Sequence, residues 1–374
     1  MTTATDLRKT PFYKSHVEHG AKLVDYAGWS MPLLYSSIID EHRQVRSAGG
    51  LFDVSHMGRF SFKGKDAARF LDRVCTRRIG TMKERQVRYS LVCNERGGCR
   101  DDVLVYKLSD TEFTMVCNAA NREKLIEHFA AVKGDLIYRF ADNTEKTAMV
   151  ALQGPKVMDV LSNFSKEIPT LKRYRFTEKS LFIAKFMVSR TGYTGEDGVE
   201  VILPASMAGK AVEMILKNMD EGEITPCGLG SRDSLRLEAG MALYGHEIDE
   251  DIDPLTAGLD FAVALDKGSA EGESEGFIGQ EALQAIAADG PAKRLIGLRL
   301  AGRRAARQGM VVRDGDREVG TVTSGCLSPT LDASIAMAIV DRDATDEGRA
   351  LSVDLGRAVD DAVVTPLPFY TRST

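Results

Sequence analysis

The chain has 374 residues, and its 49 Lys and Arg against 54 Asp and Glu give a formal net charge of −5 at pH 7. At about 100–200 residues per domain, this length predicts two or three domains, which excludes a small scaffold that depends on disulfides or a structural metal. With 43% hydrophobic and 28% charged residues, wholesale disorder is excluded as well. The negative charge disfavours nucleic acid as the main partner, although it allows a local basic pocket.

The compartment is indicated by the N-terminus and the cysteines. No apolar stretch approaches the roughly 18–20 residues of a membrane helix, so we expect a soluble protein with no membrane partner. The first residues, MTTATDLRKTPFY, contain neither an apolar signal core nor an Arg/Ser-rich transit segment, so we expect a cytoplasmic protein or an already mature chain. The six cysteines form no CxxC pair and no metal-ligand spacing with histidine, so we expect free, mostly buried thiols.

Two segments repeat one pattern. Residues 57–75 and 147–164 each combine an alternating strand, a glycine and an amphipathic helix. Each is followed by further extended runs and a second amphipathic helix, at 121–132 and 206–218. We therefore predict an α+β fold with two βαββαβ units side by side, each an antiparallel sheet with helices on one face.

The pattern changes after about residue 290. Short alternating runs separated by Gly, Asp and Pro predict a C-terminal β-barrel or sandwich, with a tight hairpin at the Asp-Gly pair within 313–318. The preceding stretch holds an acidic patch at 247–253 and the run GSAEGESEG at 268–276, which is a candidate mobile loop.

Paired aspartates stand at the start of an extended run in NERGGCRDDVLVY, residues 94–106. Because side chains alternate along a strand, one of Asp101 and Asp102 is expected to point inward and the other toward solvent. An inward carboxylate there suits an electrostatic or general-base role. The alternative is a hairpin whose turn aspartates are simply solvated.

A second acidic candidate is Glu200, between Val199 and Val201 in SRTGYTGEDGVEVILP at 189–204. Alternation puts Glu200 on the face opposite the two valines, where it could accept paired hydrogen bonds from an N–H edge such as that of a pterin or guanine. The alternative is a solvated residue on an edge strand. The glycines match neither a P-loop nor a dinucleotide-binding turn.

A helix is predicted within CGLGSRDSLRLEAGMALYGHEID, residues 227–249, with Ser231 or Asp233 as its cap. Arginine in the first turn opposes the helix dipole, so Arg232 is expected to have a partner elsewhere. The alternative is an intrahelical pair of Arg232 or Arg236 with nearby acids.

Two histidine-containing patterns give weaker evidence for a functional site. Asp53, Ser55 and His56 are too close in sequence to form a catalytic triad, whose members need distinct positions in space. His246 lies beside the acidic patch, but no second histidine stands at i+3 or i+4, so a solvated loop is preferred to a metal site.

Several long motifs, in order over nearly the whole chain, resemble the aminomethyltransferase of the glycine cleavage system, the T-protein family. They run from TPFYKSHVEHGAKLVDYAGWSMP through LFDVSHMG, GGCRDDVLVY, ALQGP, RTGYTGEDGVEV and SRDSLRLEAGMALYGHEID to VGTVTSGCLSPTL at 319–331. The resemblance implies a three-domain clover-leaf with folate in a central channel. Its domains would be a discontinuous folate-binding α+β domain (1–48 and 141–275), a second α+β domain with the catalytic aspartate (49–140) and a C-terminal β-barrel (276–374).

The resemblance also implies the reaction. An aminomethyl group on the lipoyl arm of H-protein would release ammonia and pass its one-carbon unit to the co-substrate tetrahydrofolate, giving 5,10-methylenetetrahydrofolate without a metal. Asp102 matches the catalytic aspartate. Seven further residues match positions that hold or line the folate: Glu200, Arg232, Met57, Tyr89, Val116, Asn118 and Tyr193. Phe261 stands where many relatives carry Trp, and Tyr370 is the candidate for a C-terminal tyrosine.

Other interpretations stay open. A folate-binding module without transferase activity would carry a Lys-Gly-Cys-Tyr-x-Gly-Gln segment, and this chain has SRTGYTGEDG there. A folate-dependent demethylase can share the TGYTGEDGVE motif. The basic run CTRRIGTMKERQVR at 75–88 is interpreted as a solvated face or a docking patch for acidic H-protein, rather than a nucleic-acid site. A monomer is expected.

Overall fold

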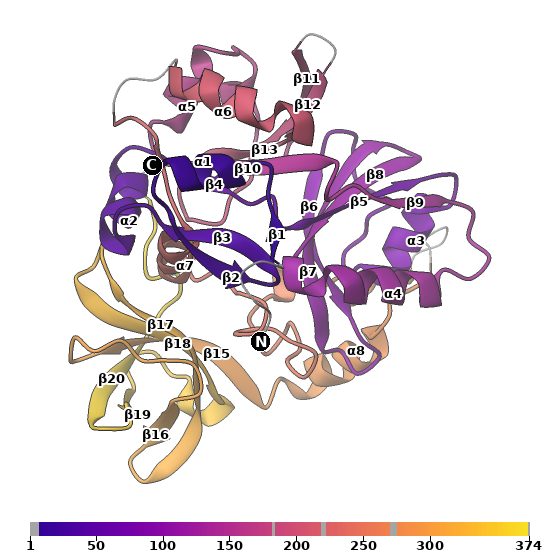
Figure 1. Cartoon of the computed structure of the whole chain (residues 1–374). Coiled ribbons are helices and arrows are strands. Elements are labelled where there is room, and N and C mark those ends of the chain that lie inside the picture. Colours follow the sequence, from indigo (N-terminus) through magenta and orange to yellow (C-terminus); the bar gives the residue numbers. More distant parts are fainter. Residues whose placement is uncertain (1–6, 182–183, 218–221, 270–274, 373–374) are drawn as a thin grey trace.

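The computed structural model describes residues 7–181, 184–217, 222–269 and 275–372 (Figure 1). Two α+β units lie side by side, and a β-barrel forms a third lobe at the lower left of the view (Figure 1). None of the helices in these ranges is long and apolar enough to cross a bilayer.

The first unit is a five-stranded sheet with the strand order β6-β7-β8-β5-β9. Its elements are β5 (Gly58–Lys63), α3 (Ala67–Val74), β6 (Val87–Cys93), β7 (Cys99–Ser109), β8 (Glu112–Cys117), α4 (Arg122–Val132) and β9 (Arg139–Asp142). The core shared with α3 and α4 is largely aromatic and includes Phe60, Phe62, Phe70 and Phe129. These rings pack edge-to-face and stacked, which suits large side chains at alternating strand positions.

The second unit is a six-stranded sheet with the order β11-β12-β13-β10-β4-β14. Its elements are β4 (Gly50–Asp53), β10 (Thr147–Gln153), α5 (Val157–Ser162), β11 (Phe176–Leu181), β12 (Ala184–Ser189), β13 (Gly198–Pro204), α6 (Ala208–Lys217) and β14 (Thr225–Pro226). Its core is mainly aliphatic, with Val150, Leu152, Val160 and Val199 among its members.

The predicted repeat is present, with one difference. In both units three strands separate the helices, so the order is β-α-β-β-β-α-β rather than βαββαβ. In the second unit, β11 and β12 pair antiparallel.

The strands of the first sheet come from one continuous stretch, residues 58–142, and those of the second sheet come from both sides of it. β4 directly precedes β5 in the chain but pairs with β10, and β9 directly precedes β10 but pairs with β5. β4, within the segment 49–140 assigned to the second domain, therefore pairs in the sheet assigned to the first. The predicted domain division at 48/49 and 140/141 stays a prediction, while the sheets themselves change between β4 and β5 and between β9 and β10.

The inner faces of the sheets meet in a common cluster. It contains Val87, Tyr106 and Val116 from the first sheet and Met149 and Ala151 from the second. The helices cover the opposite faces. Along each strand, residues whose side chains pack under the helices alternate with residues whose side chains point toward the other unit.

The N-terminal segment forms a small sheet in the order β1-β3-β2, centrally placed between the lobes (Figure 1). Its elements are β1 (Arg8–Lys9), α1 (Tyr13–Glu18), β2 (Lys22–Tyr26) and β3 (Trp29–Leu34), and α2 (Ile38–Ser47) follows. α7 (Leu229–Glu238) packs against α2 and β3. Gly228 caps α7, so the prediction of Ser231 or Asp233 as the cap is wrong; Ser231 instead bonds Glu41 and the Gly228 carbonyl.

The C-terminal lobe is a closed barrel, β15-β18-β17-β16-β19-β20, which decides between the predicted barrel and sandwich. Helix α8 (Gln280–Asp289) precedes it, and its strands are β15 (Lys293–Leu300), β16 (Val311–Asp314), β17 (Arg317–Ser328), β18 (Ala333–Asp341), β19 (Ala350–Asp354) and β20 (Val359–Thr365). The hairpin predicted at Asp-Gly joins β16 and β17, where Gly315 has φ 59°. Most of the predicted mobile loop at 268–276 lies outside the described residues.

Candidate active site

The aspartate pair lies at the start of β7, on the central part of the first sheet. Leu104 pairs with Val116 in the β7–β8 register, so two residues earlier Asp102 lies opposite Asn118. The Asn118 side-chain amide donates to Asp101 Oδ1 at 2.8 Å and to Asp102 Oδ1 at 2.7 Å. One amide group therefore orients both carboxylates.

The two aspartates differ in their surroundings. Asp101 is 0% exposed and also accepts hydrogen bonds from the Asn118 backbone N–H (3.0 Å) and the Asn121 amide (2.6 Å). Asp102 is only half-buried and lies on the inner face of the sheet, in line with Leu104. The prediction of one inward aspartate is confirmed, but the prediction that the other faces solvent is wrong, as is the interpretation of both as solvated turn residues.

The pair is electrostatically unusual. Burial raises the pKa of both carboxyl groups, and repulsion between them raises the pKa of Asp101 further. Hydrogen bonds from Asn118 and Tyr89 to Asp102 oppose this effect. A carboxyl pair of this kind retains a proton more readily than a solvated aspartate, as a proton-transfer group near neutral pH requires.

Tyr89 joins the pair from the neighbouring strand β6. Its ring stacks on Phe261, with 6.0 Å between ring centroids and an angle of 22° between the planes. Phe261 is 65% exposed, in the short 3-10 helix Asp260–Ala262. Beside Asp102 the structure therefore places an open aromatic surface built from two segments far apart in sequence.

Arg232 lies in the first turn of α7 with its guanidinium over the Tyr193 ring, 4.9 Å from the centroid. Its Nη1 is enclosed and has no hydrogen-bond partner among the described residues. The partner expected elsewhere is thus an aromatic face rather than an acid. The alternative of an intrahelical pair holds for Arg236 instead, which bonds Asp233 at 2.8 Å.

Tyr193 connects Arg232 with the aspartates. Its hydroxyl donates to the Ala242 carbonyl oxygen. Burial raises the pKa of Tyr193, and the charges of Arg236, Arg232 and Asp102 all act on it. Asp102, Tyr89, Tyr193 and Arg232 therefore surround one region between the sheets and α7.

Glu200 lies on β13, which has β12 on one side and β10 on the other, so it is not on an edge strand. It is 4% exposed and accepts a hydrogen bond from the Thr191 hydroxyl at 2.6 Å. Val199 and Val201 belong to the outer core, which puts Glu200 on the inner face as predicted and makes the solvated alternative wrong. No contact of Glu200 with Asp102 or Arg232 is found among the described residues.

The apolar candidates also lie on the inner faces. Val116 is buried in the common cluster, and Met57 packs against it. The structure thus brings the predicted residues to facing surfaces of two sheets, with Glu200 on one sheet and Asp102, Asn118 and Tyr89 on the other.

Tyr370 and His246 do not join this region through any described contact. The Arg46 guanidinium lies over the Tyr370 ring, 3.9 Å from its centroid, at the joint between α2 and the C-terminal tail. His246 Nδ1 bonds the Thr323 carbonyl oxygen of the barrel at 2.9 Å, so it is not a solvated loop residue. All six cysteines are free and five are buried, as expected from their spacing.

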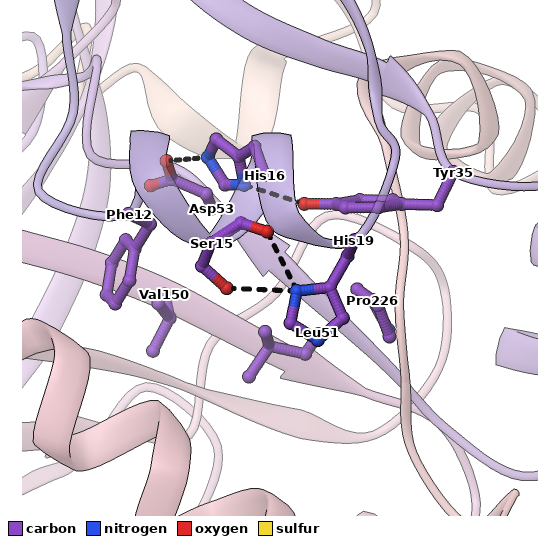
Figure 2. Close-up of a pocket in the computed structure, with 9 residues that line it drawn as sticks. All are labelled: Phe12, Ser15, His16, His19, Tyr35, Leu51, Asp53, Val150 and Pro226. Carbon is purple, nitrogen blue, oxygen red and sulfur yellow. Dashed lines mark hydrogen bonds and ion pairs between the residues drawn. The ribbon is translucent and has the colours of Figure 1, made fainter.

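Figure 2 shows a small pocket lined by the polar side chains of Ser15, His16, His19, Tyr35 and Asp53 together with apolar side chains. His16 bridges Asp53 (2.8 Å) and the Tyr35 hydroxyl (2.8 Å), so the polar groups of this pocket satisfy one another. Asp53 therefore pairs with His16 and not with His56. Ser55 donates to the Met149 carbonyl, and no Asp53–His56–Ser55 triad exists, in line with the sequence argument.

Two residues near Arg232 were missed by the sequence argument, namely Tyr26 and His56. Their rings contact each other edge-to-face, with centroids 5.3 Å apart. The sequence suggests a role for His56 only as a member of a catalytic triad, and Tyr26 is one aromatic residue among many. The contact joins segments that sequence spacing does not relate, so no local signal could have found it.

Comparison with known proteins gives a consistent picture. Residues 12–267 match the GCVT N-terminal domain, and residues 293–371 match the glycine cleavage T-protein C-terminal barrel domain. The aminomethyltransferase of Rubrobacter xylanophilus is 45% identical over 367 residues, covering 98% of this chain and 95% of that protein. The aminomethyltransferase of Caldanaerobacter subterraneus subsp. tengcongensis is 40% identical over 370 residues, covering 98% and 97%.

A solved structure agrees over almost the whole fold. The crystal structure of glycine cleavage system aminomethyltransferase T from Bartonella henselae has a TM-score of 0.89 and 32% identity, covering 97% of this chain and 98% of that one. The family matches span both α+β units and the barrel. The chain therefore belongs to the aminomethyltransferase (T-protein) family of the glycine cleavage system.

Proposed function

We propose that this aminomethyltransferase takes the aminomethyl group from the lipoyl arm of H-protein, releases ammonia and forms 5,10-methylenetetrahydrofolate. The bonds from the transferred carbon to ammonia and to sulfur break, and two carbon–nitrogen bonds to tetrahydrofolate form. The transfer needs no oxidant or reductant. Tetrahydrofolate supplies, when bound, the nitrogens that accept the one-carbon unit.

One observation carries this proposal: the carboxyl group of Asp102, whose pKa burial raises, faces the same region as an enclosed arginine with no hydrogen-bond partner among the described residues. The region has the polar and aromatic groups that a folate requires. The unpaired Nη1 of Arg232 can donate to a ligand oxygen, and the rings of Tyr89 and Tyr193 offer surfaces for a planar heterocycle.

We assign Asp102 the proton transfer. It is the less enclosed member of the pair and lies on the inner face, whereas Asp101 is held by three N–H donors. Asn118 fixes the orientation of the Asp102 carboxylate, and Tyr89 supports it. Asp102 would hold the attacking amine in position and move the proton that ammonia needs to leave.

We assign binding of the folate to the remaining residues. Glu200 would accept hydrogen bonds from an N–H edge, because its carboxylate faces the space between the sheets and is bonded by the neutral Thr191 hydroxyl. Arg232 would donate to an oxygen of the ligand. Met57, Val116 and Tyr193 would line the channel between them.

We propose that H-protein docks on a basic seam between the two units. The seam consists of the surface cations Arg77, Lys83 and Arg85 of the first unit and Lys172 and Arg173 of the second. Backbone hydrogen bonds join its halves, since the Phe176 N–H donates to the Arg85 carbonyl at 3.0 Å. An acidic carrier domain would be attracted here. Arg78, from the same basic run, bonds Asp266 at 3.1 Å.

We also infer that the enzyme acts in the cytoplasm as a monomer. Its six free cysteines fit a reducing compartment.

The test measures methylenetetrahydrofolate and ammonia formed from aminomethylated H-protein, with and without tetrahydrofolate. We expect both products only when tetrahydrofolate is present. Folate binding without turnover would contradict the proposal and favour a binding module. Turnover of small methylated amines, but not of H-protein, would favour a demethylase.

A further inference from the structure

The tip of the β2–β3 hairpin lies at the centre of the molecule, between the two units and the barrel (Figure 1). Tyr26 ends β2 and pairs with Trp29 across a two-residue turn. Both turn residues have positive φ, 52° for Ala27 and 78° for Gly28. Positive φ at alanine is unfavourable, so surrounding contacts hold this turn in place, as is common at functional sites.

Tyr26 is anchored on one side and open on the other. Its ring meets the edge of the His56 ring at an interplanar angle of 87°. Trp29, at the other end of the turn, is buried, whereas Tyr26 remains 39% exposed. The hairpin therefore presents a fixed aromatic face to the space beside it.

His56 has no other described role. It is 5% exposed, and its Nδ1 is enclosed without a hydrogen-bond partner among the described residues. Burial lowers the pKa of His56 to about 4; Asp53 opposes this shift, and the cations Arg232 and Arg59 add to it. The imidazole is therefore neutral at physiological pH and adds no charge next to Arg232.

The charges that act on Tyr26 belong in part to the groups already assigned. Burial raises the pKa of the Tyr26 phenol, and the charges of Arg232, Asp233, Arg236 and Asp102 act on it. Arg232, Arg236 and Asp102 also act on Tyr193. The N-terminal hairpin thus contributes to the region between Asp102 and Arg232 from a third direction.

We propose that Tyr26 is a ligand-contacting residue whose ring forms a third aromatic wall of the tetrahydrofolate site, and that His56 is a positioning residue that seats this ring. This inference rests on the proposed function, because it deepens the same site. A planar heteroaromatic ligand is the class that such a wall recognises, alongside Tyr89 and Tyr193.

The test is equilibrium binding of tetrahydrofolate to the full-length protein without H-protein, combined with thermal unfolding. Tyr26→Leu should raise the Kd by about fivefold or more, whereas Tyr26→Phe, which keeps the ring, should stay within about twofold of wild type. Phe164→Leu is the matched control, since Phe164 is a similarly exposed aromatic residue (38%) in the second unit. It should leave the Kd unchanged.

The positioning role of His56 needs a double-mutant cycle. His56→Leu should raise the Kd in the wild-type background and have no further effect in Tyr26→Leu, because it acts through that ring. The Tm of His56→Leu without ligand should not fall, since this variant removes the enclosed Nδ1, which has no hydrogen-bond partner among the described residues. Additive effects of the two changes would overturn the positioning role, as would a lower Tm that accounts for the weaker binding.

Failure of this inference can be told apart from failure of the proposed function. If wild type does not bind tetrahydrofolate, the proposed function fails. If wild type binds and Tyr26→Leu binds equally well, only the third wall fails. A Tyr26→Phe variant as weak as Tyr26→Leu would also overturn the aromatic wall.

Discussion

The two α+β units share one topology but use different side chains. Strand order β6-β7-β8-β5 in the first unit corresponds to β11-β12-β13-β10 in the second, with helices on the outer face of each. The outer core of the first unit is rich in phenylalanine, and that of the second is mainly Val and Leu. Topology therefore follows from the alternation of apolar residues and the position of glycines, and not from which apolar residue fills a position.

The inner faces differ in a way that matters for function. The first unit supplies Asp102, which accepts a hydrogen bond from the Asn118 amide and whose pKa is raised by burial. The second supplies the single carboxylate of Glu200, bonded by a hydroxyl group. The comparison suggests a division of labour, in which the first unit moves the proton and the second binds the co-substrate. Four predictions test this division.

The largest effect is expected for Asp102→Asn. General acid–base groups contribute about 10²–10⁴-fold, so kcat for methylenetetrahydrofolate formation should fall by that order while tetrahydrofolate affinity is retained. Steady-state kinetics together with equilibrium binding measure this. Near-normal turnover would mean that the wrong carboxylate has been chosen.

Asp101→Asn is the matched control for this experiment. It should lower the Tm, because an amide cannot accept all three N–H bonds that Asp101 receives. Asp102→Asn should instead have a higher Tm than wild type, and this difference should grow as the pH rises from about 4 toward neutrality. Burial raises the pKa of both carboxyls in the folded protein, so the folded wild type binds more protons than the unfolded chain and loses stability as the pH increases.

The second prediction concerns Glu200→Gln in the other unit. Loss of a charged acceptor costs about 1.5–3 kcal/mol, so the Kd for tetrahydrofolate should rise about 10- to 150-fold, while kcat at saturation changes little. Glu178→Gln, an exposed residue of β11 in the same sheet, is the control and should bind normally. An equal loss of kcat in Glu200→Gln would contradict the division between the units.

The third prediction contrasts these carboxylates with a structural one. Glu238 joins α7 to α2 and the barrel through His42 (3.0 Å), Arg46 (2.9 Å) and Ser328 (2.5 Å). Burial opposes ionisation, but hydrogen bonds from His42 and Ser328 and the charge of Arg46 lower the pKa of Glu238 to about 2.

Glu238→Gln should therefore destabilise the protein by about 1.5–3 kcal/mol at pH 7, because Arg46 loses its bond to this charged acceptor, although it keeps its ion pair with Glu196. A lowered pKa stabilises the fold above about pH 4 and loses that contribution as the pH falls toward 2. The Tm difference between variant and wild type should shrink over that range. A constant difference across the range would show that ionisation of Glu238 is not its source.

The smallest effect is expected at the basic seam. Arg77→Glu with Lys83→Glu should lower kcat/KM for H-protein by about tenfold at low salt and less at high salt, and leave tetrahydrofolate binding intact. Arg357→Glu, an exposed arginine of the barrel, should not change it. Unchanged kinetics in the double variant would remove the docking proposal.

Much of the fold could be predicted because its signals are local. Strand alternation, Gly64 and Gly154 before the helices, and the Asp-Gly turn at 314–315 each act over a few residues. Alternation also correctly put Glu200 on the face opposite Val199 and Val201. The capping prediction failed for Ser231 because its hydroxyl donates to Glu41, about 190 positions away in the chain.

What the sequence determined by itself is the family, the repeat and the side of its strand on which Glu200 lies. Tertiary structure alone decided the pairing of β4 with β10 and of β9 with β5, the closure of the barrel and the partners of the charged groups. The same holds for the Tyr26–His56 contact and the seating of Arg232 on Tyr193. These features depend on contacts between distant segments, whose geometry is set by packing of the whole chain and leaves no pattern in any one segment.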